Sequence, residues 1–141
     1  MKQITLIYFS PTKTTETVLR AITQGLARSL EISGSEITAV NFTRPESRST
    51  VLAPFDHNDI VLLGAPVYAG RVPADAADFF KNLTASNTPA ILTVVYGNRE
   101  YDDALLELKD IASVCGFIPV SGAAFIGEHS FASTDIPVAM N

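Results

Sequence analysis

Residues 4–16, which read ITLIYFSPTKTTE, decide how the rest of the chain is interpreted. The first six are apolar or β-favouring and predict a strand, whereas helical spacing begins directly after the turn. Within the turn lie four hydroxyls, at Ser10, Thr12, Thr14 and Thr15. Free backbone N–H groups and the positive end of the helix dipole make a helix start of this kind suitable for an anion. The stretch therefore predicts a strand, a phosphate-binding turn and the beginning of a helix.

The totals predict one folded domain. The chain has 141 residues and an apolar fraction of 47%, which together suit a single well-packed core, so residues 1–141 are interpreted as one domain. The net charge of −5 argues against nucleic-acid binding, because nucleic-acid binders normally present a basic face.

Cysteine content and hydropathy limit the cofactors that the protein can hold and its expected location. Cys115 is the only cysteine, so no intramolecular disulfide and no iron–sulfur cluster is expected, and its apolar surroundings predict a buried small side chain. No apolar run reaches the ~18 residues of a membrane span, and the chain begins with a strand pattern in place of a signal peptide. The spacing of His, Cys, Asp and Glu predicts no metal site. These features predict a cytoplasmic protein that does not meet a membrane.

Strand and helix patterns alternate along the chain. Apolar runs predict strands at residues 3–9, 36–41, 59–65, 90–96 and 118–125. Helical spacing predicts helices at residues 14–30, 73–83 and 102–115, with only one short helical turn at 46–52. Alternation of this kind predicts an α/β fold with three layers and a mostly parallel sheet.

Three loops follow the carboxyl ends of predicted strands, which is where parallel sheets bind ligands. They are residues 10–15, 66–73 and 96–101. The first offers hydroxyls, and the other two each offer aromatic residues and glycine. Phosphate donors beside two such loops suit a planar aromatic ligand with a phosphate tail.

With these loops in order, the chain resembles a flavodoxin-like domain, and more narrowly the flavodoxin portion of flavodoxin–ferredoxin fusion proteins. The phosphate loop of that family reads Ser/Thr, any, Thr, Gly, any, Thr, and residues 10–15 here read SPTKTT. The flavin-contacting loops of the family match residues 65–73, APVYAGRVP, and 96–101, YGNREY. The resemblance runs to about residue 129. It implies a flavodoxin-like open sheet of five parallel strands in the order 2-1-3-4-5.

The resemblance also implies a cofactor, FMN, and the residues that bind it. The phosphate would be bound by Ser10, Thr12, Lys13, Thr14 and Thr15. The ring would be met by Pro66, Val67, Tyr68, Ala69, Gly70, Tyr96, Gly97, Asn98, Arg99 and Tyr101. Either Tyr68 or Tyr101 would stack on the isoalloxazine, and backbone at Gly70, Gly97 and Asn98 would meet its polar edge. No catalytic residue is expected, because the chemistry of the family belongs to the flavin.

Two features depart from the family pattern. Lys13 stands where the family has glycine, so a positive φ there would cost about 1 kcal/mol, which an ammonium reaching the phosphate would offset. Residues 127–141 are too short and irregular for the usual final helix. One sheet face is therefore expected to be partly bare, or covered by a second copy or a fused domain.

Three functions remain open on these grounds. The leading one is an FMN-binding electron-transfer module with a redox protein partner, either ferredoxin-type or a flavoprotein reductase. The second is an FMN-dependent NAD(P)H:quinone-type reductase, which usually needs longer loops than this chain has. The third is an interaction scaffold without cofactor. Whether the chain is an enzyme stays open, with a carrier favoured. A response-regulator receiver is disfavoured because the relevant strand ends carry Ser10 and Pro66 where acidic residues are required.

Overall fold

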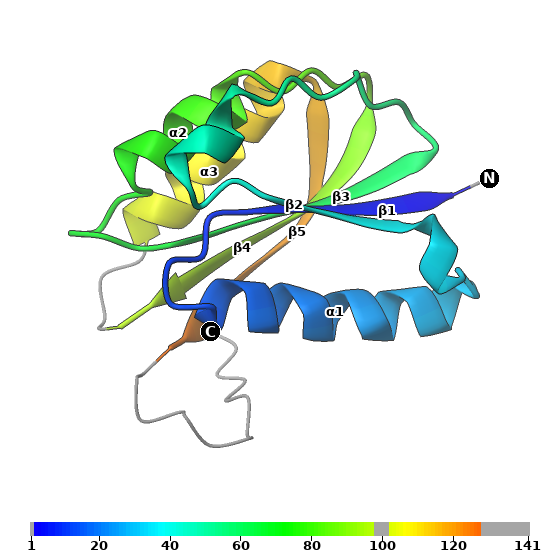
Figure 1. The fold of residues 1–141 in the computed structure, drawn as a ribbon, viewed down its shortest axis with the longest axis horizontal. Coiled ribbons are helices and arrows are strands. Elements are labelled where there is room, and N and C mark those ends of the chain that lie inside the picture. Colours follow the sequence, from blue (N-terminus) through cyan, green and yellow to red (C-terminus); the bar gives the residue numbers. More distant parts are fainter. Residues whose placement is uncertain (1, 98–101, 128–141) are drawn as a thin grey trace.

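The computed structural model describes residues 2–97 and 102–127 (Figure 1). In these residues the strands are β1 (Gln3–Tyr8), β2 (Ile37–Asn41), β3 (Asp59–Pro66), β4 (Thr88–Tyr96) and β5 (Phe117–Ile126). The α-helices are α1 (Thr14–Leu30), α2 (Ala74–Lys81) and α3 (Asp102–Cys115), and two 3₁₀ helices are η1 (Gly34–Glu36) and η2 (Pro45–Ser49).

The strands form one sheet in the order β2-β1-β3-β4-β5, and every neighbouring pair is parallel. Figure 1 shows α1 on one face of the sheet and α2 with α3 on the other. The predicted three-layer α/β fold and its strand order are confirmed. Because all strands run the same way, their carboxyl ends meet at one edge of the sheet.

Alternate side chains of β1 enter different cores, as expected of a strand covered on both faces. Ile4, Leu6 and Tyr8 pack with Leu19 of α1. Ile7 belongs to the larger core, which lies under α2 and α3. At the centre of that larger core a phenylalanine from the end of β2 meets two from α2, with Phe42 stacked 4.1 Å from Phe79 and edge-on to Phe80 at 5.2 Å.

The start of α1 lies unusually close to the sheet because residue 64 is glycine. A Cβ on Gly64 would stand 2.6 Å from Cδ1 of Leu19 and 3.0 Å from Cγ2 of Thr15. Both distances are too short for ordinary contact, so a side chain at this position would push the helix outward. Gly64 therefore fixes the position of the turn that precedes α1 relative to β3.

Element boundaries differ from prediction where proline or irregular backbone intervenes. The predicted turn at 46–52 is the 3₁₀ helix η2, and no full crossover helix occurs among residues 42–58. β4 begins at Thr88, two residues earlier than predicted, because Pro89 is tolerated near a strand start. The predicted helix at 73–83 is shorter, ending at Lys81. α1 and α3 have the predicted bounds.

In the described residues, α1 is the only α-helix on its face of the sheet (Figure 1). Two apolar residues of the edge strand β5 are open to solvent, with Ile118 47% and Val120 59% exposed. The expectation that the final helix is missing concerns residues 128–141, which lie outside the described residues. What covers this part of β5 stays a prediction.

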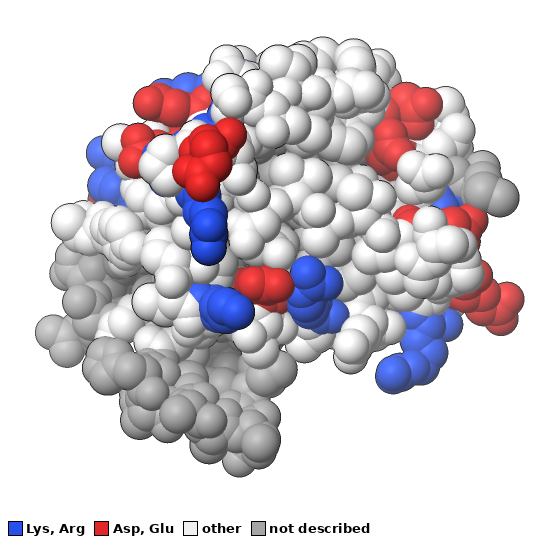
Figure 2. All heavy atoms as spheres, in the orientation of Figure 1, with Lys and Arg blue, Asp and Glu red and all other residues white. Residues whose placement is uncertain are grey.

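Charged side chains of both signs are interspersed on the face of the molecule in Figure 2. Nucleic-acid binding needs a continuous basic surface, and this face does not offer one. No helix in the described part of the chain is long and apolar enough to cross a bilayer.

Candidate functional site

The described parts of the predicted loops start at the carboxyl edge of the sheet. β1 and β3 are paired, with Tyr8 opposite Gly64, so the segments that follow them start side by side. The loop after β3 is tied to β4 by the Val67 N–H, which donates to the Val95 carbonyl at 2.9 Å. Gly127, just after β5, donates its N–H to the Tyr96 carbonyl at 2.9 Å. The fold thus gathers segments from four strands at one edge.

The turn after β1 is built around Ser10. The Lys13 N–H donates to the Ser10 carbonyl at 3.2 Å, which closes the turn. The Ser10 hydroxyl accepts the Glu16 N–H at 3.0 Å and so caps α1 from outside the helix. Across residues 2–97 and 102–127, no acceptor pairs with the backbone N–H of Thr14 or Thr15. Within the described part of the chain, two backbone donors at the positive end of this seventeen-residue helix are thus left without an acceptor.

The hydroxyls of the turn are not equally accessible. Ser10 is 6% and Thr15 2% exposed, whereas Thr12 lies open to solvent and Thr14 is half-buried. The hydroxyls of Thr12 and Thr14 lie 3.3 Å apart and hydrogen-bond to each other. A ligand from solvent would meet Thr12 and Thr14 first, with Ser10 behind them.

Lys13 adopts a left-handed conformation, with φ of 68°. The positive φ whose cost was considered from the sequence is therefore present at this position. The Lys13 carbonyl accepts both the Thr17 N–H at 3.0 Å and the Thr17 hydroxyl at 2.8 Å. The lysine side chain is exposed beside the turn, and its contact with a phosphate remains a prediction.

A second set of residues, which the sequence did not reveal, supports the same turn from β2. The Ser10 N–H donates to the Thr43 hydroxyl at 2.8 Å. Arg48 of η2 donates to the carbonyls of Phe42 at 3.2 Å and Thr43 at 2.6 Å. Arg48 also pairs with Asp75 of α2 at 3.2 Å. These contacts span from β2 to α2, and no local pattern signals them.

The loop after β3 contains a tight two-residue turn. Tyr68 and Arg71 exchange backbone hydrogen bonds, of 2.8 Å from the Tyr68 N–H and 3.0 Å from the Arg71 N–H. The residues between them both have positive φ, 52° at Ala69 and 81° at Gly70. This is the type I′ class of turn. Gly70 tolerates its positive φ readily, whereas the left-handed Ala69 was not expected. We call residues 68–71 the ring turn.

Glu107 of α3 joins the ring turn from across the surface. Its carboxylate accepts two hydrogen bonds from the Arg71 guanidinium, at 3.0 and 3.1 Å, and a third from the Val72 N–H at 3.0 Å. Burial raises the pKa of Glu107, but the hydrogen bonds from Arg71 and Val72 and the positive charge of Arg71 outweigh it. The pKa of Glu107 therefore lies below its ordinary value. Nothing in the local sequence of α3 predicts this role.

The predicted aromatic residues of the site divide into exposed and buried. Tyr68 is 50% exposed, whereas Tyr96 is 6% exposed and packs in the core under α2 and α3. Gly97 lies exposed at the end of β4. The predictions for Asn98, Arg99 and Tyr101 concern residues outside the described ones. Tyr68 is thus the described aromatic of the predicted set that a ligand can reach.

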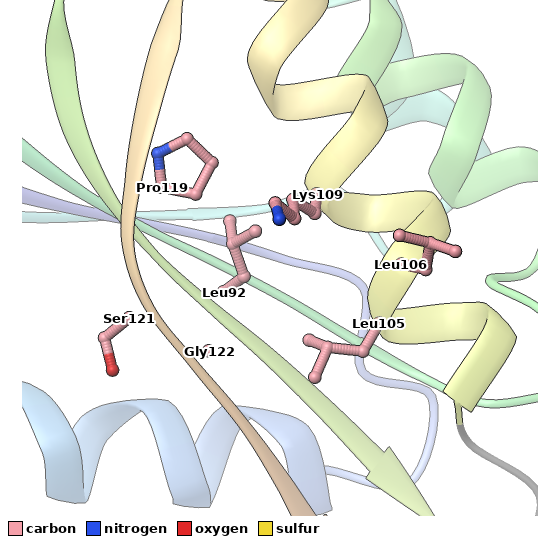
Figure 3. A pocket seen from close by; sticks show the side chains of 7 residues that line it. All are labelled: Leu92, Leu105, Leu106, Lys109, Pro119, Ser121 and Gly122. Atoms are coloured by element: carbon pink, nitrogen blue, oxygen red, sulfur yellow. The ribbon is translucent and has the colours of Figure 1, made fainter.

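Among the hollows in the described part of the chain, two are candidate binding sites. One, of about 410 Å³, is mainly apolar and lies between α3 and the middle of β4 and β5 (Figure 3). Its lining comprises Leu92, Leu105, Leu106, Lys109, Pro119, Ser121 and Gly122, none of which belongs to the predicted site. The other, of about 620 Å³, flanks the ring turn and α2. Its charged residues are Arg71, Asp75, Asp78, Lys81 and Glu107, three acidic and two basic.

Metal-binding and thiol chemistry find no support in the described part. No group of three or more His, Cys, Asp or Glu side chains there is arranged to hold a metal ion. The Cys115 thiol is half-buried and donates to the Phe80 carbonyl at 3.4 Å. Burial raises the pKa of this thiol, so it behaves as the packing residue that the sequence predicts.

Solved structures with a similar fold include flavodoxins and flavoproteins. Flavodoxin 1 from Bacillus cereus has a TM-score of 0.60 and 17% identity, with 92% of this chain and 88% of that chain covered. Megasphaera elsdenii flavodoxin has a TM-score of 0.57 and 18% identity, with 93% and 90% covered. A Lactobacillus acidophilus flavoprotein solved in complex with FMN has a TM-score of 0.57 and 12% identity, with 88% and 93% covered. No protein-family model and no curated protein matches the chain. At these identities the likeness shows a flavodoxin-like fold.

Proposed function

We propose that this chain binds FMN at the carboxyl edge of its sheet and works as an electron-transfer module. The observation that carries the proposal is the pairing of two features at one edge. At the start of α1, the N–H groups of Thr14 and Thr15 have no acceptor among the described residues. The neighbouring strand β3 leads into the ring turn, with an exposed Tyr68. A phosphate and a planar ring on one molecule would use both.

The residues present fit the phosphate of FMN. The N–H groups of Thr14 and Thr15 and the hydroxyls of Thr12 and Thr14 are donors without bulk. The Ser10 hydroxyl accepts from Glu16, so its own proton remains available for an anion. Lys13 would add a positive charge. Among the residues that the structure describes, no acidic side chain is hydrogen-bonded to these groups, although the backbone of Glu16 belongs to the same helix turn.

The ring turn fits the other half of the cofactor. An exposed tyrosine offers a face for stacking, and the turn brings backbone N–H and carbonyl groups close to it. FMN supplies one-electron chemistry when bound, and the protein sets the environment of the ring. The described residues that would do so are Tyr68, Ala69 and Gly70.

A carrier fits better than a free-standing reductase. The hollow beside the ring turn contains three carboxylates against two cations, a poor balance for the pyrophosphate of a nicotinamide dinucleotide. A redox protein partner, ferredoxin-type or a flavoprotein reductase, would then deliver or accept the electrons. A cytoplasmic location and a second copy or fused domain on β5 remain parts of the proposal.

Spectra and rapid kinetics test the proposal. Purified protein mixed with FMN is expected to show shifted flavin absorption bands and quenched flavin fluorescence. Stopped-flow mixing of that complex with NADH or NADPH alone is expected to leave the flavin oxidised. Rapid bleaching would replace the carrier with the NAD(P)H-dependent reductase. Unchanged FMN spectra at high protein concentration would instead favour the third function, an interaction scaffold that binds no cofactor.

A further inference from the structure

The ring turn is held in a conformation that its sequence does not favour. Ala69 has φ of 52°, a region that costs a residue with a Cβ about 1 kcal/mol or more. Such residues persist only where their surroundings determine the backbone strongly. Contacts with other parts of the chain are therefore needed to hold the ring turn in this conformation.

Beside the packing of Val67 and Val72 in the core, two sets of hydrogen bonds connect the turn and its flanking residues with the rest of the described chain. Before it, the Val67 N–H donates to Val95 of β4. After it, the Glu107 carboxylate accepts from Arg71 and from the Val72 N–H. In residues 2–97 and 102–127, residues 68–72 make no other hydrogen bond outside the turn. Among the side chains that the structure describes, Glu107 is thus the single one that hydrogen-bonds to the turn from another element.

We infer that Glu107 is the positioning residue of the ring turn, and that its carboxylate determines the positions of Tyr68 and the Ala69–Gly70 peptide. The inference rests on the proposed function for the identity of the ligand. The contact between Glu107 and the ring turn is independent of the proposed function.

The two halves of the contact are unequal. The Arg71 side chain is 62% exposed, so its ion pair with Glu107 is screened by solvent. Val72 is 4% exposed, so without Glu107 its N–H would be left buried and unpaired. The Val72 hydrogen bond is therefore expected to matter more than the Arg71 pair. A glutamine at position 107 can still accept from Val72 through its carbonyl oxygen, whereas an alanine cannot.

The first test follows the Val72 amide in protein without FMN. Hydrogen exchange measured by NMR is expected to be at least roughly tenfold faster in Glu107→Ala than in the wild type. Glu107→Gln and Arg71→Gln should show smaller increases. Asp110→Asn, an exposed acid on the same helix, is the matched control and should leave the rate unchanged. Equal Val72 exchange in Glu107→Ala and wild type would overturn the inference.

The second test adds FMN and reads properties that a purely structural role would not move. Glu107→Ala is expected to weaken FMN binding by about tenfold, equivalent to about 1.4 kcal/mol, and to shift the midpoint potentials of the bound flavin. Glu107→Gln should retain most of the affinity, which keeps the test valid if the alanine variant folds poorly. Unchanged affinity and potentials beside a lowered unfolding free energy would overturn the positioning role. If the wild type binds no FMN, the proposed function fails, and Val72 exchange still decides whether Glu107 holds the loop.

Discussion

The turn at residues 10–15 and the ring turn both need a residue with positive φ, but different contacts hold the two turns in place. Each contains a residue with a side chain at positive φ, Lys13 at 68° and Ala69 at 52°. The first turn is closed by contacts within seven residues, through the carbonyl and hydroxyl of Ser10, and one more hydrogen bond, from the Ser10 N–H to the Thr43 hydroxyl, supports it from a distance. The ring turn is held by Glu107, 35 residues beyond Val72.

This difference indicates how each turn should respond to change. The turn at residues 10–15 is closed mainly against its own helix, so it depends chiefly on whether α1 forms and where it lies. A turn held from another helix depends on one distant carboxylate and can move while α1 stays intact. Substitutions can therefore separate the two regions.

The largest effect is expected from Gly64→Val. The new side chain would collide with Leu19 and Thr15 and displace the start of α1, at a cost of about 1–3 kcal/mol. Urea unfolding would show the loss, while Val72 exchange should stay near wild type. Gly25→Ala is the control, because nothing lies within 4 Å of its added Cβ. Wild-type stability in Gly64→Val would contradict the close approach of α1.

A smaller loss is expected from Ser10→Ala. The Glu16 N–H would lose its cap, which lowers the unfolding free energy by about 1 kcal/mol. FMN binding should weaken as well, since one phosphate donor is removed. Thr12→Ala provides the comparison, because it removes an exposed hydroxyl that does not cap the helix. Equal stability of the two variants would argue against the cap.

Acid should weaken the ring turn selectively. The pKa of Glu107 is lower in the folded state than in the unfolded state, so its contribution to stability is present above the unfolded pKa of about 4.3. That contribution is lost as the pH falls through the folded pKa. The stability difference between wild type and Glu107→Gln, below about 1 kcal/mol at neutral pH, should shrink below pH ~4. A difference that grows on acidification would contradict this sign.

The smallest effects are expected from glycine at the two left-handed positions. Lys13→Gly and Ala69→Gly each relieve about 1 kcal/mol of strain but add unfolded-chain entropy worth about 0.5–1 kcal/mol. Unfolding free energies should therefore change by only a few tenths of a kcal/mol. Lys13→Gly should still weaken FMN binding if the ammonium meets the phosphate. Unchanged FMN affinity would remove Lys13 from the site.

The sequence was most informative where the determining contacts are local. Periodicity and end signals placed α1 and α3 at their observed bounds, and the four hydroxyls marked the first turn. The family glycine raised a left-handed Lys13 as a condition, and the structure has it. Thr43, Arg48 and Glu107 escaped prediction because each acts on a segment distant in sequence or from another element. The start of β4 was predicted two residues too late, at residue 90, because the strand includes Pro89 near its start.

The most direct test of the central claim compares FMN with riboflavin, which has the ring without the phosphate. Equilibrium titration by flavin fluorescence should show FMN binding at least about tenfold more tightly than riboflavin, because only FMN can use the free N–H groups of Thr14 and Thr15. Equal affinities, or no binding of either flavin, would contradict a phosphate site at the start of α1.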